Sequence, residues 1–289
     1  MRDIERAGPR IAIIDSGLGL LSTAAALRRA RPDAHLVLAT DPEHMPWGPR
    51  SAADITARVR AGLQAVLDQS GRPPQAVVVA CNSASVYALP SLRAELEPQI
   101  PVIGTVPAVK PAADLGGPIA IWATPATTGS AYQRDLIARF APDMSVAPIA
   151  CPGLAAAVES ADPAALTDAL DEASRRTPSD TTTVVLGCTH YDLVSERIHQ
   201  VLGSGVTLFS AAGAVATQTL RRLGQTAAPA APPTGSVLVL ASGSATQLPP
   251  AALFYPAGAL LAAATLTTEP DSATMTAGDA YQRPGPTFP

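Results

Sequence analysis

The sequence predicts an α/β fold made of two similar, doubly wound parallel-sheet domains. Short runs of aliphatic and β-branched residues end in small polar or glycine-containing turns, and each is followed by a segment with helical periodicity. Strands that are apolar along their whole length and separated by helices are typical of a parallel sheet covered on both faces. The expected strands are 11–15, 36–40, 76–81, 119–124 and 183–188, and the clearest expected helices are 51–69 and 130–140.

An internal repetition predicts that there are two halves. Residues 11–15 (IAIID) reappear as 119–123 (IAIWA) at an offset of 108, and 77–83 (VVVACNS) reappear as 184–190 (VVLGCTH) at an offset of 107. Because the two offsets nearly agree, we expect two domains related by pseudo-symmetry, each with a cysteine after a corresponding strand. Ligands of open parallel sheets bind beyond the carboxyl ends of the strands. We therefore expect an active site in the cleft between the domains.

Proline and glycine mark where the chain crosses between these domains. The stretch 101–111 contains three prolines, and a return crossing is expected near 203–210. The first domain is then 1–103 together with 208–268, and the second is 104–207. Residues 269–289 are rich in Pro, Ser, Thr and Gly, so we expect a mobile tail there.

Composition excludes several classes of protein. The chain has 289 residues, with Lys+Arg 20, Asp+Glu 24 and a formal net charge of −4, so a nucleic-acid partner is not expected. Hydrophobic residues make up 47% and charged residues 15%, which favours a folded core over disorder. The first ten residues lack an apolar core, and the longest apolar stretch, 251–266, is shorter than the roughly 20 residues that span a bilayer. We expect no membrane association and a cytoplasmic location.

The three cysteines form no CxxC pair, which argues against both a disulfide framework and a structural metal site. Cys151 has no counterpart in the other half, and we expect a structural role for it. Cys81 and Cys188 each precede small polar residues where a helix should begin. Unpaired backbone N–H groups and the helix dipole favour a thiolate there. We therefore expect the pKa of both thiols to fall from about 8.5 toward neutrality.

Two thiols facing one cleft are suited to removing a proton from one face of a carbon and returning one to the opposite face. Such transfer needs one deprotonated and one protonated group with pKa values near the working pH. A redox disulfide and a metal site are the alternatives. The first lacks a CxxC partner, and the second would have only His190 close to Cys188.

Polar residues after the strands supply further candidates. The stretch 15–19 (DSGLG) has neither a GxGxxG nor a GK[ST] pattern, and its leading Asp15 would repel phosphate, so a nucleotide site is disfavoured. Asp15 is better suited to bind an ammonium group or to assist a thiol. His190 is a hydrogen-bond donor, a proton shuttle or a structural residue. The stretch 45–49 (MPWGP) is a proline-stiffened turn whose Gly48 amide suits a carboxylate.

The motifs together resemble the successive signatures of bacterial glutamate racemases, in order and with fitting spacing, from about residue 11 to about 260. They are IDSGLG at 14–19, MPWGPRS at 45–51, ACNSAS at 80–85, PVIGTVP at 101–107, ATPATTGSAY at 123–132, CPGLAAAVE at 151–159 and LGCTHYDL at 186–193. The resemblance implies an isomerase of the cofactor-independent aspartate/glutamate racemase superfamily. It also implies glutamate as substrate, no pyridoxal phosphate, a supply of D-glutamate for peptidoglycan, and compatibility with a homodimer.

The resemblance also implies roles for individual residues. Cys81 and Cys188 would be the acid/base pair, one serving each enantiomer, with Asp15, Glu159 and His190 as polar assistants to the thiols. The substrate-binding positions would be Asp15, Ser16, Trp47, Gly48, Asn82, Ser83, Thr189 and His190.

Several positions depart from the family's pattern. Trp47 replaces the family's usual Tyr, Ser83 replaces Thr, and the usual Asp of the return segment is absent around Phe209. Glu43 and His44 place an extra carboxylate and imidazole near the expected entrance. These changes bear on the substrate more than on the reaction.

Two other functions therefore stay open. One is a racemase or epimerase of the same superfamily that acts on aspartate or another amino acid. The other is a regulatory protein that binds an amino acid without turnover, although a binding site has no use for a matched pair of thiols.

Overall fold

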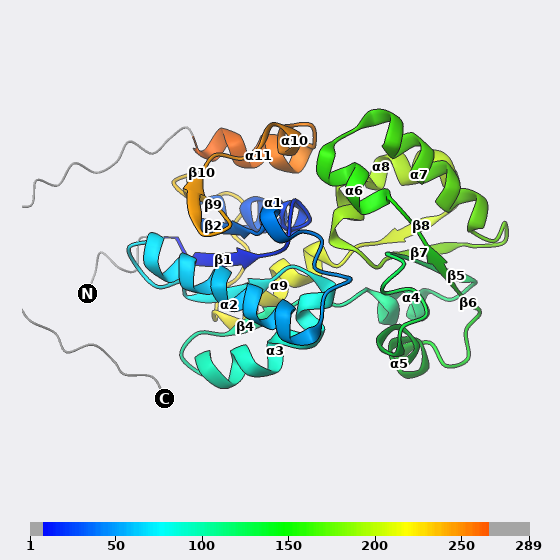
Figure 1. Cartoon of the computed structure of the whole chain (residues 1–289), viewed down its shortest axis with the longest axis horizontal. Helices are drawn as coiled ribbons and strands as arrows, with labels where there is room; N and C mark the ends of the chain where they lie inside the picture. Colours follow the sequence, from blue (N-terminus) through cyan, green and yellow to red (C-terminus); the bar gives the residue numbers. More distant parts are fainter. Residues whose placement is uncertain (1–7, 266–289) are drawn as a thin grey trace, which may run out of the picture.

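Two sheets lie side by side along the long axis of the computed structural model, which describes residues 8–265 (Figure 1). The first has the order β10-β9-β2-β1-β3-β4, and all its neighbours are parallel except β10 and β9. Its strands are β1 (Arg10–Ile14), β2 (His35–Thr40), β3 (Ala76–Val79), β4 (Val102–Gly104), β9 (Val237–Ala241) and β10 (Ser244–Thr246). The second, all parallel, has the order β6-β5-β7-β8, formed by β5 (Ile119–Ala123), β6 (Val146–Ala150), β7 (Thr183–Leu186) and β8 (Thr207–Phe209).

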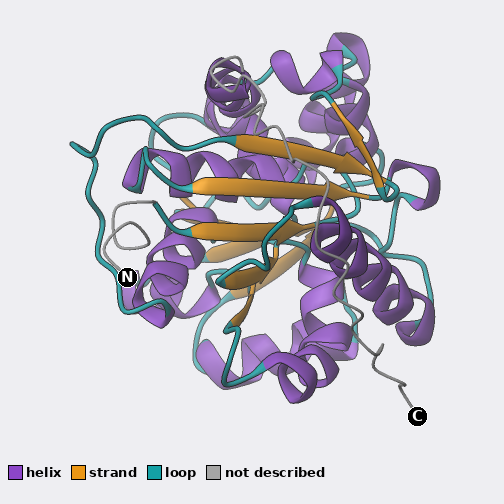
Figure 2. Ribbon diagram, turned by 90° about the vertical axis from the view of Figure 1, so that its left-hand side faces the viewer, coloured by secondary structure: helices purple, strands orange, loops and turns teal. Residues whose placement is uncertain are grey.

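Helices enclose the strands on both sides (Figure 2). Those of the first half are α1 (Leu20–Ala30), η1 (Pro42–His44), α2 (Ala52–Gln69), α3 (Asn82–Leu96), α9 (Ala212–Arg222), α10 (Pro250–Leu253) and α11 (Pro256–Thr265). Those of the second are α4 (Val109–Leu115), α5 (Ala131–Phe140), α6 (Leu154–Ser160), α7 (Pro163–Arg176), η2 (Thr189–Val194) and α8 (Ser195–Leu202). The predicted α/β class with parallel sheets is confirmed.

The repetition in the sequence corresponds to a repetition in strand pairing. Strand β1 pairs with β3 with Ile11 opposite Ala76, and β5 pairs with β7 with Ile119 opposite Thr183. The offsets of 108 and 107 thus relate the pair β1 and β3 to the pair β5 and β7, with the same register in both pairs. The strands that precede Cys81 and Cys188 are therefore equivalent members of the two sheets.

Alternation along β1 shows why the first sheet is covered on both faces. Ile11 and Ile13 pack in one apolar cluster with side chains of α1, whereas Ala12 and Ile14 pack in another with side chains of α2 and α3. Successive residues of a strand point to opposite faces, so a strand buried on both sides is apolar throughout. The predicted helices 51–69 and 130–140 each begin one residue later, because Ser51 and Ser130 are N-caps that accept hydrogen bonds from backbone amides.

The two halves share one continuous hydrophobic core. The cluster that contains Ile11 and Ile13 continues through Leu18 and α1 to Tyr191 of η2 and Val158 of α6.

Within residues 8–265, no helix is long and apolar enough to cross a membrane.

The predicted domain boundaries fall inside strands. The boundary after residue 103 lies within β4, and the boundary after residue 207 lies within β8. Leu208 and Phe209 pair with Val184 and Val185 of β7, so these two residues belong to the second sheet and not to the first domain. The division of the chain otherwise stays a prediction, and the expected tail at 269–289 lies outside the described residues.

A truncation in β1 tests the double coverage of the first sheet. We expect Ile13→Ala to lower the free energy of unfolding by about 2–5 kcal/mol, because Ile13 is fully buried and its removal leaves a cavity. Leu67→Ala on the exposed side of α2 is the control and should change it by about 0.5 kcal/mol or less. Urea denaturation measures both, and an equal effect of the two substitutions would contradict this packing.

Candidate active site

Both predicted thiols reach one cavity of about 310 Å³ that lies between the two sheets. Its walls come from loops that follow strands of both halves. All the predicted site residues except Glu159 line it, namely Asp15, Ser16, Trp47, Gly48, Cys81, Asn82, Ser83, Cys188, Thr189 and His190. The sequence-based grouping of these side chains around one space is therefore matched by the structure.

The same local construction places each thiol. Cys81 follows β3 and is the N-cap of α3, while Cys188 follows β7 and is the N-cap of the 3₁₀ helix η2. Both cysteines are free, and each residue as a whole is partly exposed. The side-chain amide of Asn82 donates a hydrogen bond of 2.8 Å to the carbonyl oxygen of Gly187. This bond joins the residue after one thiol to the residue before the other.

The electrostatic expectation for Cys81 was wrong. Burial and the nearby Asp15 carboxylate raise its pKa well above the ordinary value, and the backbone amide of Ala84 at the helix start lowers it too little to compensate. Desolvation and a neighbouring negative charge both favour the neutral thiol. Cys81 therefore keeps its proton at neutral pH.

His190 connects Cys188 to Glu159. Its Nδ1 lies 3.9 Å from the Cys188 sulfur, and its Nε2 donates to Glu159 Oε2 at 2.9 Å. Burial alone would lower the pKa of His190, but the hydrogen bonds with Cys188 and Glu159 and the charges of Cys188 and Asp15 raise it well above the ordinary value. A cation next to Cys188 stabilises negative charge on that sulfur.

Glu159 does not line the cavity and reaches it only through His190. Besides His190 Nε2, its Oε2 accepts a 2.7 Å hydrogen bond from the backbone N–H of Leu18, which belongs to the other half. The carboxylate therefore fixes the imidazole ring and ties the two halves together.

Asp15 is buried at the end of β1 and faces the second half. Its carboxylate accepts hydrogen bonds from the backbone N–H of Ser16 at 2.6 Å and from Thr189 Oγ1 at 3.2 Å. Burial raises the pKa of Asp15 to about 6, although the charge of His190 and the two hydrogen bonds lower it. Asp15 is thus the anion beside Cys81, as His190 is the cation beside Cys188.

The glycines of 15–19 serve close contact between the halves. A Cβ atom on Gly17 would lie 2.4 Å from Glu159 Oε2, and one on Gly19 would lie 2.4 Å from Thr189 Oγ1 and 2.8 Å from His190 Nδ1. A side chain at either position would displace the Glu159 carboxylate or the Thr189 and His190 side chains. The phosphate-loop appearance of this stretch therefore reflects packing against the second half.

The loop 45–49 forms another wall of the cavity. Trp47 is buried, and a Cβ atom on Gly48 would lie 3.9 Å from Ser83 Oγ and 4.0 Å from Thr124 Oγ1. Gly48 thus lies opposite one hydroxyl group from each half, and a Cβ atom there would be in ordinary van der Waals contact with both. The turn is a wall of the site as well as a proline-stiffened loop.

Sequence reasoning did not single out two further lining residues, Thr124 and Thr127. They follow β5, their hydroxyl oxygens lie 3.2 Å apart, and both line the cavity. The internal offset of 108 maps Ser16 onto Thr124, so the repetition contained the signal. Cys151 also lines the cavity, but burial raises its pKa to about 12, and its sulfur contacts the backbone carbonyl of Ile149.

Comparison with known proteins finds relatives over most of the chain. The sequence profile of the Asp/Glu/Hydantoin racemase family matches residues 17–219. A glutamate racemase of Salmonella typhimurium is 39% identical over 221 residues, which cover 73% of this chain and 76% of that protein. The Escherichia coli glutamate racemase, solved in complex with L-glutamate and the activator UDP-MurNAc-ala, is similar with a TM-score of 0.71 at 34% identity, covering 86% of this chain and 92% of that one. A Bacillus anthracis glutamate racemase gives 0.66 at 30% identity, covering 82% and 89%.

The charge assigned to His190 can be measured directly. In NMR titrations of the ring protons, we expect His190 to remain protonated above pH 7, whereas burial and nearby arginines lower the pKa of His35 below 6.5. Because folding raises the pKa of His190, the stability from its charge is complete below about pH 6.5 and is lost as pH rises through the folded-state pKa.

Glu159→Gln isolates the contribution of the carboxylate, because the amide oxygen still accepts from Leu18. We expect this variant to lower the pKa of His190 and to leave that of His35 unchanged. Glu172→Gln is the control, since Glu172 forms its ion pairs with Arg175 and Arg176 on the surface of α7. Titration of His190 at or below 6.5 in the unmodified protein would contradict the assignment.

Proposed function

Because the chain belongs to the Asp/Glu/Hydantoin racemase family, we propose that it is a cofactor-independent glutamate racemase that interconverts L-glutamate and D-glutamate. One observation above all supports this: two free, partly exposed cysteines from equivalent positions of the two halves line a single cavity. The identity of its glutamate racemase relatives, at 34% to 39% over most of the chain, supports the substrate.

In this mechanism one sulfur takes the α-proton and the other supplies a new one. The C–H bond breaks with its electron pair left on the α-carbon, and an S–H bond forms on the thiolate. The opposite S–H bond then breaks, and its proton forms a new C–H bond on the other face of the carbon. Nothing is oxidised or reduced, and each turnover exchanges the protonation states of Cys81 and Cys188.

The surroundings of the two sulfurs fit these opposite tasks. Cys81, with its raised pKa beside Asp15, is the proton donor at rest. Cys188, with the His190 imidazolium 3.9 Å away, is the sulfur on which negative charge is stabilised. A general acid and a general base need such different environments to act within one turnover.

The polar groups of the cavity can bind an amino acid by its charges. The amide nitrogen of Asn82 donates to Gly187, and its side-chain oxygen is buried with no hydrogen-bond partner among residues 8–265. This oxygen and the Asp15 carboxylate can accept from the α-ammonium group. The Gly48 amide and the hydroxyls of Ser83 and Thr124 can donate to carboxylates and to negative charge that develops in the transition state.

The departures from the family pattern favour testing other substrates as well. A racemase of aspartate or of another amino acid would use the same pair of thiols and a cavity of the same design. Supply of D-glutamate for peptidoglycan, a cytoplasmic location and a homodimer stay predictions of the family resemblance. A regulatory protein without turnover would bind an amino acid and leave its α-proton in place.

Chiral chromatography of single enantiomers tests the substrate. We expect L-glutamate and D-glutamate each to be converted to the racemate, and aspartate, alanine and serine to be converted at least about 100-fold more slowly. Interconversion of another amino acid in the absence of glutamate turnover would overturn the substrate assignment. No turnover of any enantiomer, with binding of one, would favour the regulatory protein.

Substitution of single thiols in deuterium oxide tests the mechanism. We expect Cys81→Ala and Cys188→Ala each to slow racemisation at least about 100-fold, because each removes one of two proton-transfer groups. Each variant should retain slow α-deuterium exchange without inversion, and only with the enantiomer whose α-proton faces the remaining thiol.

Cys151→Ala is the matched control, since it deletes the third thiol of the same cavity. We expect it to racemise within a few-fold of the unmodified rate. An undiminished rate in either Cys81→Ala or Cys188→Ala would rule out the two-base mechanism.

A further inference from the structure

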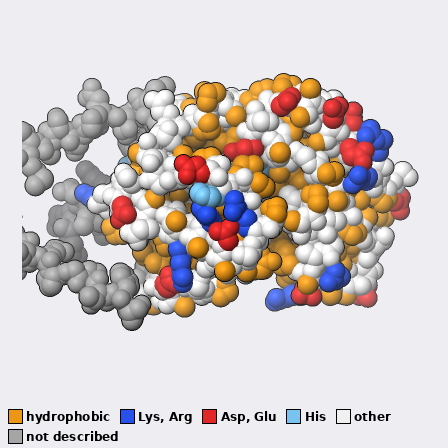
Figure 3. All heavy atoms as spheres, viewed as in Figure 1, with side chains coloured by type: hydrophobic (Ala, Val, Ile, Leu, Met, Phe, Trp, Pro, Cys, Tyr) orange, Lys and Arg blue, Asp and Glu red, His pale blue; other side chains and the backbone are white. Residues whose placement is uncertain are grey.

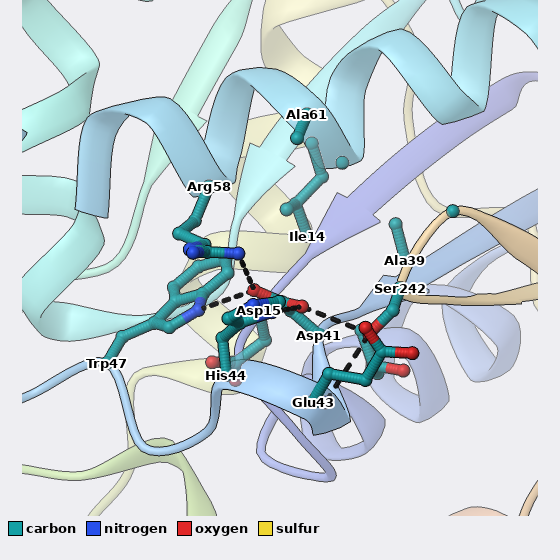
Figure 4. Close-up of a pocket in the computed structure, with 13 residues that line it drawn as sticks. Ile14, Asp15, Ala39, Asp41, Glu43, His44, Trp47, Arg58, Ala61 and Ser242 are labelled. Carbon is teal, nitrogen blue, oxygen red and sulfur yellow. Dashed lines mark hydrogen bonds and ion pairs between the residues drawn. The ribbon is translucent and has the colours of Figure 1, made fainter. Parts of the chain in front are cut away.

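A second, smaller cavity of about 140 Å³ lies behind the loop 45–49 and shares Asp15 and Trp47 with the substrate cavity (Figure 4). The carboxylate of Asp41 lies at its centre. Asp41 accepts hydrogen bonds from the indole Nε1–H of Trp47 at 3.2 Å, from Ser242 Oγ at 3.0 Å and from His44 Nδ1 at 2.9 Å. An ionised carboxylate has no hydrogen to donate, so Asp41 is the acceptor in all three hydrogen bonds.

The groups around Asp41 come from distant parts of the chain. Asp41 follows β2, Ser242 lies in the turn between β9 and β10, and Arg58 of α2 has its Nη1 3.9 Å from Asp41 Oδ2. The backbone N–H of Asp41 donates to the carbonyl oxygen of Ser16 at 3.2 Å. Asp41 is therefore held next to the first sheet and next to Ser16, which lines the substrate cavity. It can serve as an anchor for the loop 45–49.

Asp41 is also tied to the charged surface of the first domain. Ion pairs link Asp41, His44, Arg50, Asp54 and Arg58. Figure 3 shows basic, acidic and histidine side chains gathered on one face of the molecule. Burial would raise the pKa of Asp41, but the hydrogen bonds from His44, Trp47 and Ser242 hold it below its usual value. The acceptor is thus ionised at neutral pH.

Trp47 depends on this acceptor. Its side chain is only 1% exposed, and the indole N–H is its single polar group. Without Asp41 that N–H would be buried and unpaired, which is strongly unfavourable. The bond therefore selects the ring orientation in which Trp47 walls the substrate cavity and its neighbour Gly48 faces Ser83 and Thr124.

We propose that Asp41 is a positioning residue for substrate binding, which acts through the Trp47 indole to hold the Trp47–Gly48 wall in place. Asp41 does not line the substrate cavity itself. Its effect should therefore fall on KM, because the wall binds the substrate and takes no part in proton transfer. The kinetic part of this inference rests on the proposed racemase function.

A double-mutant cycle with glutamate tests whether Asp41 acts through the indole. We expect Asp41→Ala and Trp47→Phe each to raise KM about tenfold, a change typical of a lost hydrogen bond to a charged group, and to leave kcat within about twofold. The double variant should be no worse than Trp47→Phe alone, because the phenyl ring has no N–H for Asp41 to hold. Additive effects of the two substitutions would overturn the proposal.

Two further variants separate this role from a general structural one. Asp41→Asn keeps an acceptor oxygen of the same shape and should restore KM to within about twofold, and it also serves if Asp41→Ala does not fold. Ser242→Ala removes a different hydrogen bond of Asp41 and should leave KM within about twofold. A tenfold rise in KM for Ser242→Ala, or for Asp41→Asn, would contradict an action through the indole.

The indole N–H itself gives a readout that does not depend on the substrate. The chain has two tryptophans, and Trp122 donates its own indole N–H to Thr177 Oγ1 at 2.9 Å. In ¹H–¹⁵N spectra, Asp41→Ala should shift the Trp47 indole resonance and accelerate its hydrogen exchange, with Trp122 unchanged as the internal control; Trp47→Phe assigns the two signals. An unmoved Trp47 signal overturns the proposal. If the unmodified protein does not turn over glutamate, the proposed function fails while this measurement still decides whether Asp41 holds the wall.

Discussion

The chemistry proposed for this protein depends on polar contacts that cross between its two halves. Asn82 binds the carbonyl of Gly187, Thr189 binds Asp15, and Glu159 binds the backbone of Leu18. Each of these residues lies within a few positions of a thiol or contacts a residue that does. Side chains of the site thus help to join the two halves, and the substrate must fit between walls that these hydrogen bonds connect.

These contacts also make a pseudo-symmetric pair of thiols chemically unequal. The residues after Cys81 are Asn82 and Ser83, whereas the residues after Cys188 are Thr189 and the imidazole of His190. Burial and the charge of the Asp15 carboxylate raise the pKa of Cys81. The strand–thiol–helix unit occurs twice and supplies two thiols, and the residues that differ around them give the two sulfurs different electrostatic surroundings.

Periodicity and repetition are local properties, so the sequence was sufficient to predict the parallel sheets, the helices at 51–69 and 130–140, and the grouping of the two thiols. The direction of the Cys81 pKa shift could not be found in the same way. The helix start lowers that pKa locally, but Asp15 comes from a different strand and contributes with burial to a larger opposite effect. The contact of Gly17 with Glu159 and the bond from Trp47 to Asp41 likewise join residues whose proximity only the folded chain reveals. The boundary at 207 falls inside β8 because this strand has only three residues, and the glycine signal places the return crossing no more closely than 203–210.

The two sides of the substrate cavity differ in how firmly they are built. On the side of α1 and η2, the halves share a buried apolar cluster, and Tyr255 adds a hydrogen bond of 2.6 Å to the carbonyl of Val158. Separating the halves there would expose apolar surface and leave buried polar groups unpaired, both of which are costly. On the opposite side the wall is the short loop 45–49, which the Trp47 side chain anchors through its hydrogen bond to Asp41. Changes in the shape of the cavity therefore cost less at this loop than at the shared core, and one of the departures from the family pattern, Trp47, lies in this loop.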